Sequence, residues 1–391
     1  MEAVKIADNV YWVGAIDWNG RNFHGYDTPR GTSYNAYLII DDKIALIDAV
    51  KTPFLPQMME RIRSVVDPKD IDVIISNHSE NDHSSGLPTV QEMTGAPIYA
   101  SRKGAEHLPL NYGPLQLNKV MDGQDMNLGK YNLKFMETPM LHWPDSMFTY
   151  LKEQGILFCM DGFGQHFASS KRFDDEVDQG ALFEEAAKYY ANILMPFGQP
   201  YQAALQKLKG LDIKMLATAH GLIWRSDIPS VLELYDRWSN HQTEKKAVVI
   251  FDSMWGSTEK MAMAISEGIT AGGVTVWVCK ASVTPRSVVM REVLDARAVV
   301  FGTPTLNMGM FPTMADMAVY LKGLKPRNRL GACFGAYGWS AGGVKALKET
   351  LNGSGLEFAF EDLEVRFNPQ DSDLKRCFEF GLSIAKKIIM G

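Results

Sequence analysis

The stretch "HSENDH", residues 78–83, places two histidines, a glutamate and an aspartate within six positions. It comes just after "IDVIIS" (71–76), a largely apolar run with the length and β-branched content of a buried strand. Imidazole and carboxylate groups without a thiolate suit iron, manganese or zinc. The stretch therefore predicts a metal-binding loop at the end of a strand.

The spacing within this loop is compatible with two metal ions. On a tight loop alternate residues can turn toward one point, so His78 and Glu80 could bind one ion, and Asp82 and His83 a second one nearby. Each ion needs further ligands, and three candidates lie at or beside the ends of other apolar runs: His142 in "PMLHWPDS" (139–146), Asp161 in "FCMDGFG" (158–164) and His220 in "LATAHGLIW" (216–224).

The composition is that of a globular protein of two to three domains, with 391 residues, 46% hydrophobic and 22% charged. The net charge of −6 gives no indication of a nucleic-acid surface, and no apolar run is long enough to span a membrane. The N-terminus lacks the pattern of a secretory signal. Four scattered cysteines predict buried thiols in a reducing cytoplasm rather than disulfides, a zinc ribbon or a cysteine-bound iron–sulfur centre.

The first part of the chain, residues 1–240, mixes strands with helices. Short apolar runs bounded by turn residues predict strands at 9–15, 36–41, 43–49, 71–76, 97–100, 132–138, 147–151 and 156–160. Helical periodicity predicts helices at 53–66, 84–94, 182–194 and 198–209. The pattern favours a sandwich of sheets with helices outside.

The polar stretch "SNHQTEKK" (239–246) reads as a linker, and it places a domain boundary between residues 246 and 247. Beyond it, strands and helices alternate strictly. Strands are expected at 247–253, 274–280, 297–305, 329–338 and 357–366, and helices at 258–273, 285–296, 312–324, 340–355 and 371–390. Such alternation predicts a parallel, doubly wound sheet that binds its ligand at the carboxyl ends of the strands.

The loop "DSMWGSTEK" (252–260) has the composition of a phosphate site. It supplies hydroxyl groups, Gly256 allows the backbone to bend toward a ligand, and the next helix offers its free N–H groups. The loop matches neither the Walker pattern nor the spaced-glycine dinucleotide pattern, so a monophosphate dianion fits better than a nucleoside triphosphate.

Two further loops, 303–309 and 336–343, are expected at the same edge and bring aromatic side chains on which a flat ring could stack. This combination resembles flavodoxin, which implies bound FMN. The residues expected to bind it are Ser253, Met254, Trp255, Gly256, Ser257, Thr258, Pro304, Thr305, Leu306, Asn307, Ala336, Tyr337, Gly338 and Trp339.

The whole chain resembles one known family. A strand-end H-x-[HE]-x-D-H followed by a distant His, an Asp and a last His is the metal signature of the metallo-β-lactamase fold, in which zinc hydrolases usually carry histidine where this chain has Glu80. A domain of that kind with glutamate there, followed by a flavodoxin-like domain, resembles the flavodiiron proteins. The stretches 21–38, 140–150, 185–196 and 252–260 are similar to that family as well.

The resemblance implies an αββα metallo-β-lactamase-like domain, residues 1–246, followed by a flavodoxin-like domain, residues 247–391. It implies one iron bound by His78, Glu80 and His142, another bound by Asp82, His83 and His220, and Asp161 as the bridge between them. His24 and Tyr190 match residues that line the open side of the site in the family.

The expected activity is reduction of dioxygen to water, of nitric oxide to nitrous oxide, or of both. Two ferrous ions and reduced FMN together hold the four electrons that dioxygen requires. The chain has no rubredoxin-like cysteine pairs, so the electron donor is expected to be a separate rubredoxin or a reduced deazaflavin. The family also implies a head-to-tail homodimer, or a tetramer built from it, in which the FMN of one subunit serves the irons of the other.

Two other functions are weighed against this one. A zinc hydrolase joined to an electron-transfer flavodoxin domain would use a zinc-bound hydroxide, and Glu80 counts against it. An electron carrier with a vestigial metal site is disfavoured because all seven ligand positions are filled.

Overall fold

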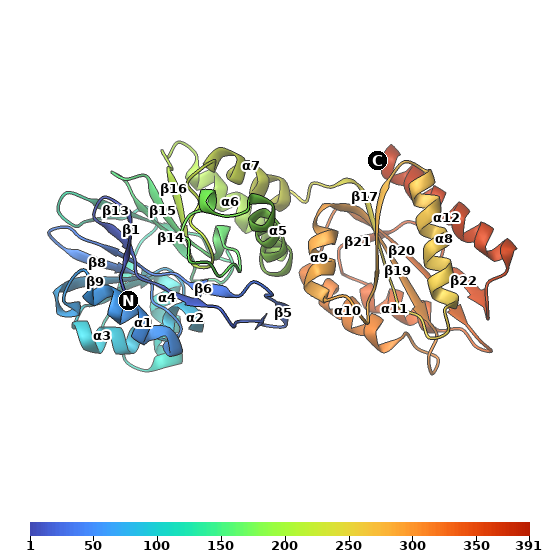
Figure 1. Cartoon of the computed structure of the whole chain (residues 1–391), viewed down its shortest axis with the longest axis horizontal. Helices are drawn as coiled ribbons and strands as arrows, with labels where there is room; N and C mark the ends of the chain where they lie inside the picture. Colours follow the sequence, from blue (N-terminus) through green and yellow to red (C-terminus); the bar gives the residue numbers. More distant parts are fainter. The chain divides into compact units, whose positions relative to one another are not determined.

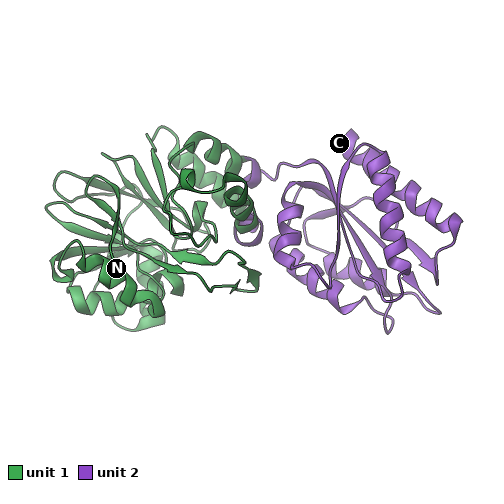
Figure 2. Ribbon diagram, in the orientation of Figure 1, with its two compact units in different colours: residues 1–189, 197–236 green, residues 190–196, 237–391 purple.

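The computed structural model describes residues 1–391 and divides into two compact units. The first unit comprises Met1–Tyr189 and Phe197–Asp236, and the second comprises Tyr190–Pro196 and Arg237–Gly391 (Figure 2). The second unit therefore takes in a short segment from the middle of the chain, together with the residues from Arg237 onward.

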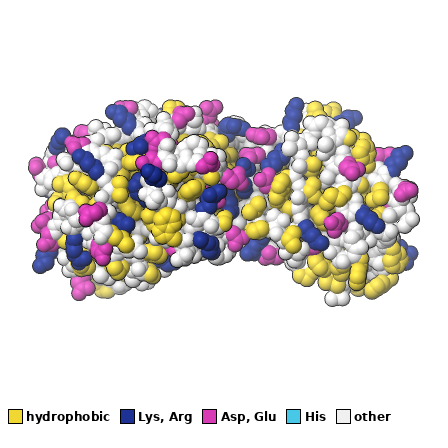
Figure 3. Space-filling view, in the orientation of Figure 1, with side chains coloured by type: hydrophobic (Ala, Val, Ile, Leu, Met, Phe, Trp, Pro, Cys, Tyr) yellow, Lys and Arg dark blue, Asp and Glu magenta, His cyan; other side chains and the backbone are white.

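On the face seen in Figure 3, acidic and basic side chains are interspersed over both units. No helix has both the length and the apolar character that a membrane crossing requires.

The first unit is built on two sheets packed face to face (Figure 1). The seven-stranded sheet has the order β1 (Val4–Ala7), β2 (Val10–Trp12), β7 (Tyr37–Ile39), β8 (Ile44–Ile47), β9 (Ile71–Ser76), β10 (Ile98–Ser101) and β11 (Leu117–Val120). The five-stranded sheet has the order β12 (Asp125–Asn127), β13 (Asn132–Glu137), β14 (Met147–Leu151), β15 (Ile156–Met160) and β16 (Met215–Thr218). Two small ribbons pair β3 (Ala15–Asp17) with β6 (Thr32–Tyr34) and β4 (Asn22–Phe23) with β5 (Tyr26–Asp27).

The central core lies between the two sheets and contains side chains from both, such as Ile75 of β9 and Phe135 of β13. Strands β14 and β15 are buried at every position because each is covered on both faces. The helices of this unit are α1 (Leu55–Arg63), α2 (Asn81–Ser84), α3 (Leu87–Thr94), α4 (Arg102–Tyr112), α5 (Gln179–Tyr189), α6 (Gly198–Leu208) and α7 (Ile228–Ser239).

These helices lie on the outer faces. Apolar residues of α1, α3 and α4 form a second core with the first sheet. Against the second sheet, the Phe163 ring contacts the rings of Tyr201 on α6 and Tyr235 on α7. The predicted αββα sandwich is therefore confirmed. Single-turn helices complete the unit: η1 (Thr52–Phe54), η2 (Pro68–Asp70), η3 (Asp161–Phe163) and η4 (Asp174–Glu176). The π-helix η5 (Tyr190–Leu194) lies in the segment that belongs to the second unit, and η6 (Met195–Phe197) begins there.

The second unit has one sheet in which every pairing is parallel. Its order is β18 (Thr275–Lys280), β17 (Glu244–Phe251), β19 (Ala296–Pro304), β20 (Arg329–Tyr337) and β21 (Leu356–Phe358), and β22 (Leu363–Arg366) also pairs with β20. The helices are α8 (Ser257–Ala271), α9 (Arg286–Asp295), α10 (Pro312–Leu324), α11 (Gly343–Leu351) and α12 (Asp371–Met390). The predicted doubly wound parallel sheet is confirmed.

Two details of this unit differ from the sequence prediction. Residues Glu244–Lys246, predicted to lie in a linker, begin β17, because polar side chains at the exposed end of a central strand stay in water while the backbone pairs. The last predicted strand, 357–366, is two strands, β21 and β22, separated by a loop.

Helices α8 and α12 pack against each other so closely that their backbones touch. A Cβ at Gly268 would lie 2.0 Å from the carbonyl oxygen of Phe378, and one at Gly381 would lie 2.1 Å from that of Ile265. Both positions therefore require glycine. This contact fixes α8, whose first turn lies at the carboxyl edge of the sheet.

Candidate metal centre and ring-binding pocket

The loop after β9 is held in place by buried hydrogen bonds at both ends. At its start, the Asn77 backbone N–H and side-chain amide donate to Asp48, at 2.7 and 2.8 Å. At its end, the Ser84 hydroxyl bonds the carbonyl oxygens of Ser79 and Glu80, both at 2.8 Å. The intervening turn, with the four-residue α2, therefore presents its side chains in fixed directions.

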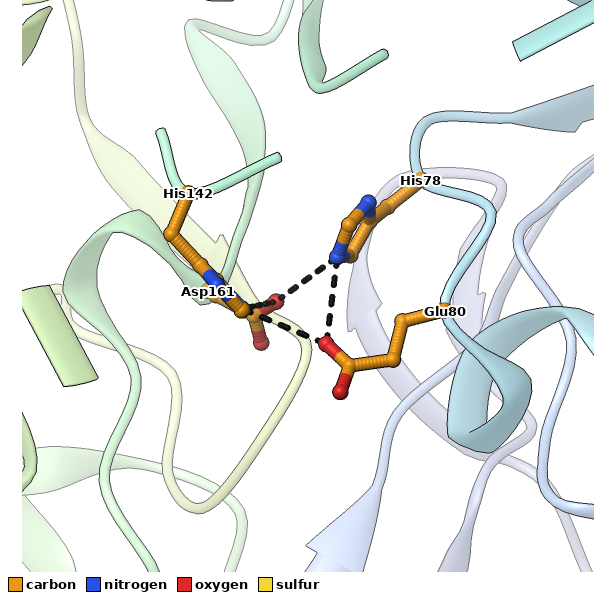
Figure 4. A group of neighbouring side chains, drawn as sticks. All are labelled: His78, Glu80, His142 and Asp161. Carbon is orange, nitrogen blue, oxygen red and sulfur yellow. Dashed lines mark hydrogen bonds and ion pairs between the residues drawn. The ribbon is translucent and has the colours of Figure 1, made fainter. Parts of the chain in front are cut away.

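The loop contributes to two adjacent clusters of ligand-type side chains. In the first cluster, His78, Glu80, His142 and Asp161 turn toward one point (Figure 4). The Glu80 Oε2 lies 3.3 Å from the His78 Nε2 and 3.2 Å from the His142 Nε2. The Asp161 Oδ2 lies 3.4 Å from the His142 Nε2 and 3.7 Å from the His78 Nε2.

The second cluster consists of Asp82, His83 and His220. The Asp82 Oδ2 lies 3.2 Å from the His83 Nε2 and 3.1 Å from the His220 Nε2. The other oxygen of Asp161, Oδ1, lies 3.4 and 3.5 Å from the same two ring nitrogens. One oxygen of Asp161 thus faces each cluster, and all seven predicted ligands lie together.

The buried atoms of these clusters fit metal ions. Both carboxylate oxygens of Asp82 and both ring nitrogens of His83 are buried without a hydrogen-bond partner. Buried polar atoms rarely stay unpaired, because leaving water without compensation is costly. The donor set of four imidazoles and three carboxylates, with no thiolate, suits iron or another intermediate cation.

The electrostatics of the clusters point the same way. Burial alone would lower the pKa of His83, but the Asp82 and Asp161 carboxylates raise it to about 9. Burial would raise the pKa of Asp161, yet the surrounding imidazoles, His83 first, hold it well below its ordinary value. The carboxylates therefore stay ionised and make an anionic pocket that favours cations.

His24 and Tyr190, expected on the open side of the site, lie in different surroundings. The His24 Nε2 is 3.1 Å from the Glu80 Oε1, and its side chain is 71% exposed. Tyr190 is fully buried in the segment that packs with the second unit, where its ring lies against Trp238. The preceding residue, Tyr189, donates its hydroxyl to the Asp161 Oδ1 at 2.9 Å.

Tyr189 was missed because neighbouring residues of a helix point about 100° apart, and the sequence does not fix that rotation here. Helix α5 ends at Tyr189 and the π-helix η5 begins at Tyr190, which changes the register between the two tyrosines. The adjacent aromatic pair in "KYY" (188–190) was the available signal.

The second unit holds a cavity of about 920 Å³ at the carboxyl edge of its sheet. Of the residues predicted to bind the ring and phosphate, all but Gly256 line it. Four lining residues were not predicted: Met308, Ser340, Phe367 and Asn368. The last two follow β22, whose carboxyl end lies at the same edge as the others.

The phosphate end of this cavity is an α-helix N-terminus with an unpaired hydroxyl. Gly256 caps α8 with a φ of 83°, and no atom lies within 4 Å of where its Cβ would be. The Gly256 N–H donates to the Ser253 hydroxyl at 3.0 Å. The Thr258 Oγ1 is buried without a hydrogen-bond partner, as expected of a group that bonds a phosphate oxygen.

The ring end of the cavity is rimmed by exposed aromatic side chains. Trp255 is 91% exposed and Trp339 is 89% exposed. Indole rings of this size are rarely left in water unless a ligand or partner covers them. The cavity therefore fits a flat ring carrying a monophosphate, as FMN does.

Comparison with known proteins matches both units. Residues 32–221 match the ODP family beta lactamase model, and residues 249–381 match the flavodoxin model. A nitric oxide reductase of Moorella thermoacetica is 45% identical over 395 residues, covering 99% of this chain and 99% of that protein.

Two solved structures match over the full length. The rubredoxin oxygen:oxidoreductase of Desulfovibrio gigas has a TM-score of 0.97 at 36% identity, covering 100% of this chain and 99% of that one. The flavodiiron protein of Giardia intestinalis has a TM-score of 0.97 at 36% identity, covering 100% and 97%.

Proposed function

Because the chain belongs to the flavodiiron protein family, we propose that it reduces dioxygen to water, nitric oxide to nitrous oxide, or both, with FMN and two irons as cofactors. The observation that carries the proposal is the convergence of seven imidazole and carboxylate side chains, two of which, Asp82 and His83, have buried polar atoms without a hydrogen-bond partner. The chain is an oxidoreductase, as its named relatives are.

In this proposal His78, Glu80 and His142 hold one iron, and Asp82, His83 and His220 hold the other, with Asp161 between them. The cavity between the loops after β17, β19, β20 and β22 holds FMN, with its phosphate at Thr258 and the start of α8. When bound, the irons supply open coordination positions for the gas, and together with reduced FMN they supply its electrons.

Both reactions consume protons, and in this proposal His24 brings them to the site. Its Nε2 contacts the Glu80 Oε1 while most of its side chain is in water. The Nε2–H can therefore pass a proton from solvent toward the edge of the first cluster. Position 24 has a positive φ of 55°, a backbone conformation that is uncommon for residues other than glycine.

The electron donor in this proposal is a separate rubredoxin, with a reduced deazaflavin as the alternative. The four cysteines are buried and form no disulfide, which supports the proposed cytoplasmic location. The exposed Trp255 and Trp339 at the flavin pocket give a partner an apolar surface to cover.

A head-to-tail homodimer, or a tetramer built from it, is part of the same proposal, since electrons tunnel only over short distances. It rests on the family resemblance and on the exposed aromatic rim of the pocket. Analytical ultracentrifugation of active protein tests it, and a fully active monomer would rule it out.

Steady-state turnover tests the proposed reaction. Each gas is added in turn to an anaerobic mixture of the protein and chemically reduced rubredoxin. Consumption of dioxygen without release of peroxide, or formation of nitrous oxide from nitric oxide, supports it. Metal analysis of the same anaerobic preparation separates it from a zinc hydrolase, which would contain two zinc ions and no iron per chain.

A further inference from the structure

The two ligand clusters are nearly equivalent in the groups that face the metal. Each has two imidazoles and one carboxylate of its own, and each receives one oxygen of Asp161. These contacts alone give no reason for the two irons to differ. The difference lies in the groups behind the ligands.

Behind His78 stands a carboxylate. The His78 Nδ1, on the far side of the ring from the metal cluster, lies 3.3 Å from the Asp145 Oδ2. The same oxygen accepts the Ser79 backbone N–H at 2.6 Å, which fixes Asp145 in position. Both side chains are fully buried, so water does not weaken this contact.

The Asp145 carboxylate therefore faces the His78 ring from a fixed and fully buried position. A carboxylate behind a ligating histidine fixes its tautomer and makes the ring a stronger electron donor.

Behind the second cluster no carboxylate bonds an imidazole. The His220 Nδ1 lies 2.7 Å from the Ser33 carbonyl oxygen, a neutral acceptor, and 3.4 Å from the Thr32 hydroxyl. The His83 Nδ1 has no hydrogen-bond partner. Both rings are therefore weaker donors than His78.

The contact at Asp161 adds to this asymmetry. The Tyr189 hydroxyl donates to the Asp161 Oδ1, the oxygen that faces His83 and His220. A donated hydrogen bond withdraws electron density from the oxygen that receives it. In the first cluster the His24 Nε2 contacts the Glu80 Oε1, but the His24 side chain is 71% exposed, so water weakens that contact. The second cluster thus has the weaker oxygen of Asp161 as well as the weaker imidazoles.

We propose that Asp145 and Tyr189 make the two irons electronically unequal, so that the first electron added to a diferric pair goes to the iron at Asp82, His83 and His220. With iron bound, Asp82, His83 and His220 would hold the ion that is reduced first, and His78, Glu80 and His142 would hold the ion that stays ferric until a second electron is supplied. Electron-rich ligands favour the ferric ion, and Asp145 supplies that preference through His78. The inference rests on the proposed diiron function.

Both residues are positioning residues that act through a ligand, and reduction potentials report their effect where activity alone would not. The experiment is an anaerobic titration of the iron-loaded full-length protein with dithionite, followed by electron paramagnetic resonance of the mixed-valent state. The wild type, Asp145→Asn and Tyr189→Phe are compared, with iron content measured for each.

In the wild type we expect two separate one-electron steps and a mixed-valent signal between them. Asp145→Asn should raise the potential of the second step and leave the first in place, because it weakens the donor at the ferric site. Tyr189→Phe should lower the potential of the first step, because it strengthens the Asp161 oxygen at the other site. Each variant should therefore lose mixed-valent signal, and the double variant most.

Asp174→Asn is the matched control. Asp174 is also a buried carboxylate of the first unit, but its oxygens accept the backbone N–H groups of Arg225 and Ser226, and it contacts no ligand ring. This variant should leave both steps and the mixed-valent signal as in the wild type. Losing a contact of this kind is expected to lower iron affinity ~10–100-fold. If the Asp145→Asn protein loses more than that and binds no iron, the potentials of Tyr189→Phe alone decide whether the inference holds.

Variants with unchanged separation between the steps, or Asp145→Asn moving the first step, would overturn the inference. A wild type that binds no iron would instead refute the proposed function, so the two failures are distinguishable.

Discussion

The metal centre and the flavin pocket are assembled in opposite ways. The metal ligands come from loops after β9, β13, β15 and β16, are mostly buried, and are held by buried polar contacts from elsewhere in the first unit. The flavin pocket is an open cavity made by loops at the carboxyl ends of neighbouring parallel strands. The first site depends on particular side-chain networks, whereas the second depends mainly on topology.

The largest expected effect follows from removing the one residue that serves both clusters. Asp161→Asn should prevent the binding of two irons and lower the rate of gas reduction by more than ~100-fold. Even the loss of a group behind a ligand lowers metal affinity or activity by about 10–100-fold. FMN content should be unchanged because the pocket lies in the other unit. Iron and flavin are measured on the same sample.

Asp212→Asn, at a side chain that is 82% exposed, is the matched control for Asp161 and should behave as the wild type. Full iron content and normal turnover in Asp161→Asn would break the proposed contrast between the two sites.

The reciprocal change tests the flavin pocket. Thr258→Val removes the unpaired buried hydroxyl while keeping the side-chain shape. A hydrogen bond to a charged group contributes about 1.5–3 kcal/mol, so FMN affinity should fall ~10–100-fold. The stability of the flavin-free protein should be unchanged or increased, because an unpaired polar atom has been removed.

Fluorescence titration with FMN and thermal unfolding without it measure these two effects, and Thr275→Val on the exposed side of β18 is the control. An unchanged FMN affinity would place the phosphate elsewhere.

The dependence of the metal centre on buried networks is tested at Asn35. Its side chain accepts the Trp12 indole N–H at 2.8 Å and donates to the carbonyl oxygens of Thr218 and Gly221, which flank His220. Asn35→Ala leaves the buried indole N–H unpaired and should lower the free energy of unfolding by about 2 kcal/mol. It should also weaken iron binding, because the segment that carries His220 loses its support.

Urea unfolding and iron titration of Asn35→Ala are compared with Asn118→Ala, an exposed position on β11. Lower stability with full iron affinity would mean that the network supports the fold but not the metal loop.

The smallest effect concerns acid stability of the second unit. Burial, with Arg329 and Arg327 nearby, lowers the pKa of His241 to about 4. A histidine with a depressed folded pKa favours the unfolded state as the pH falls from 6.5 through 4. Part of the stability that the protein loses on acidification is therefore due to His241. His241→Asn should reduce this loss of stability by about 1 kcal/mol after allowance for solvent screening, and asparagine tolerates the φ of 52° at this position.

Chemical denaturation at pH 7 and pH 4.5 measures this effect of His241→Asn. Identical pH profiles for the variant and the wild type would show that His241 is not the group responsible.

The same difference between the two sites explains which parts of the structure the sequence predicted. The strict alternation after residue 246 predicted the parallel sheet, and topology then placed three loops at one edge. Phe367 and Asn368 were missed because the last strand was not followed to that edge. Helix α4 was missed because it contains Gly104 and Pro109, which have low helix propensity, although Ser101 caps it.

In the first unit the ligand residues stand out as residue types at strand ends, but the groups behind them do not. Asp145 has no local signal, because its role arises from a contact with a residue far away in the chain. The tyrosine pair at 189–190 does not show which of its two rings turns toward Asp161, because that depends on the rotation of a helix end. A sequence pattern can therefore predict which side chains bind a metal without predicting what tunes it.

Anomalous diffraction at the iron absorption edge, from a crystal of the iron-loaded protein, tests the central claim most directly. We predict two iron peaks, one contacting His78, Glu80 and His142 and the other contacting Asp82, His83 and His220, with one oxygen of Asp161 on each. A single peak, no iron peak, or peaks only at the zinc edge would contradict the claim that these seven side chains hold a pair of irons.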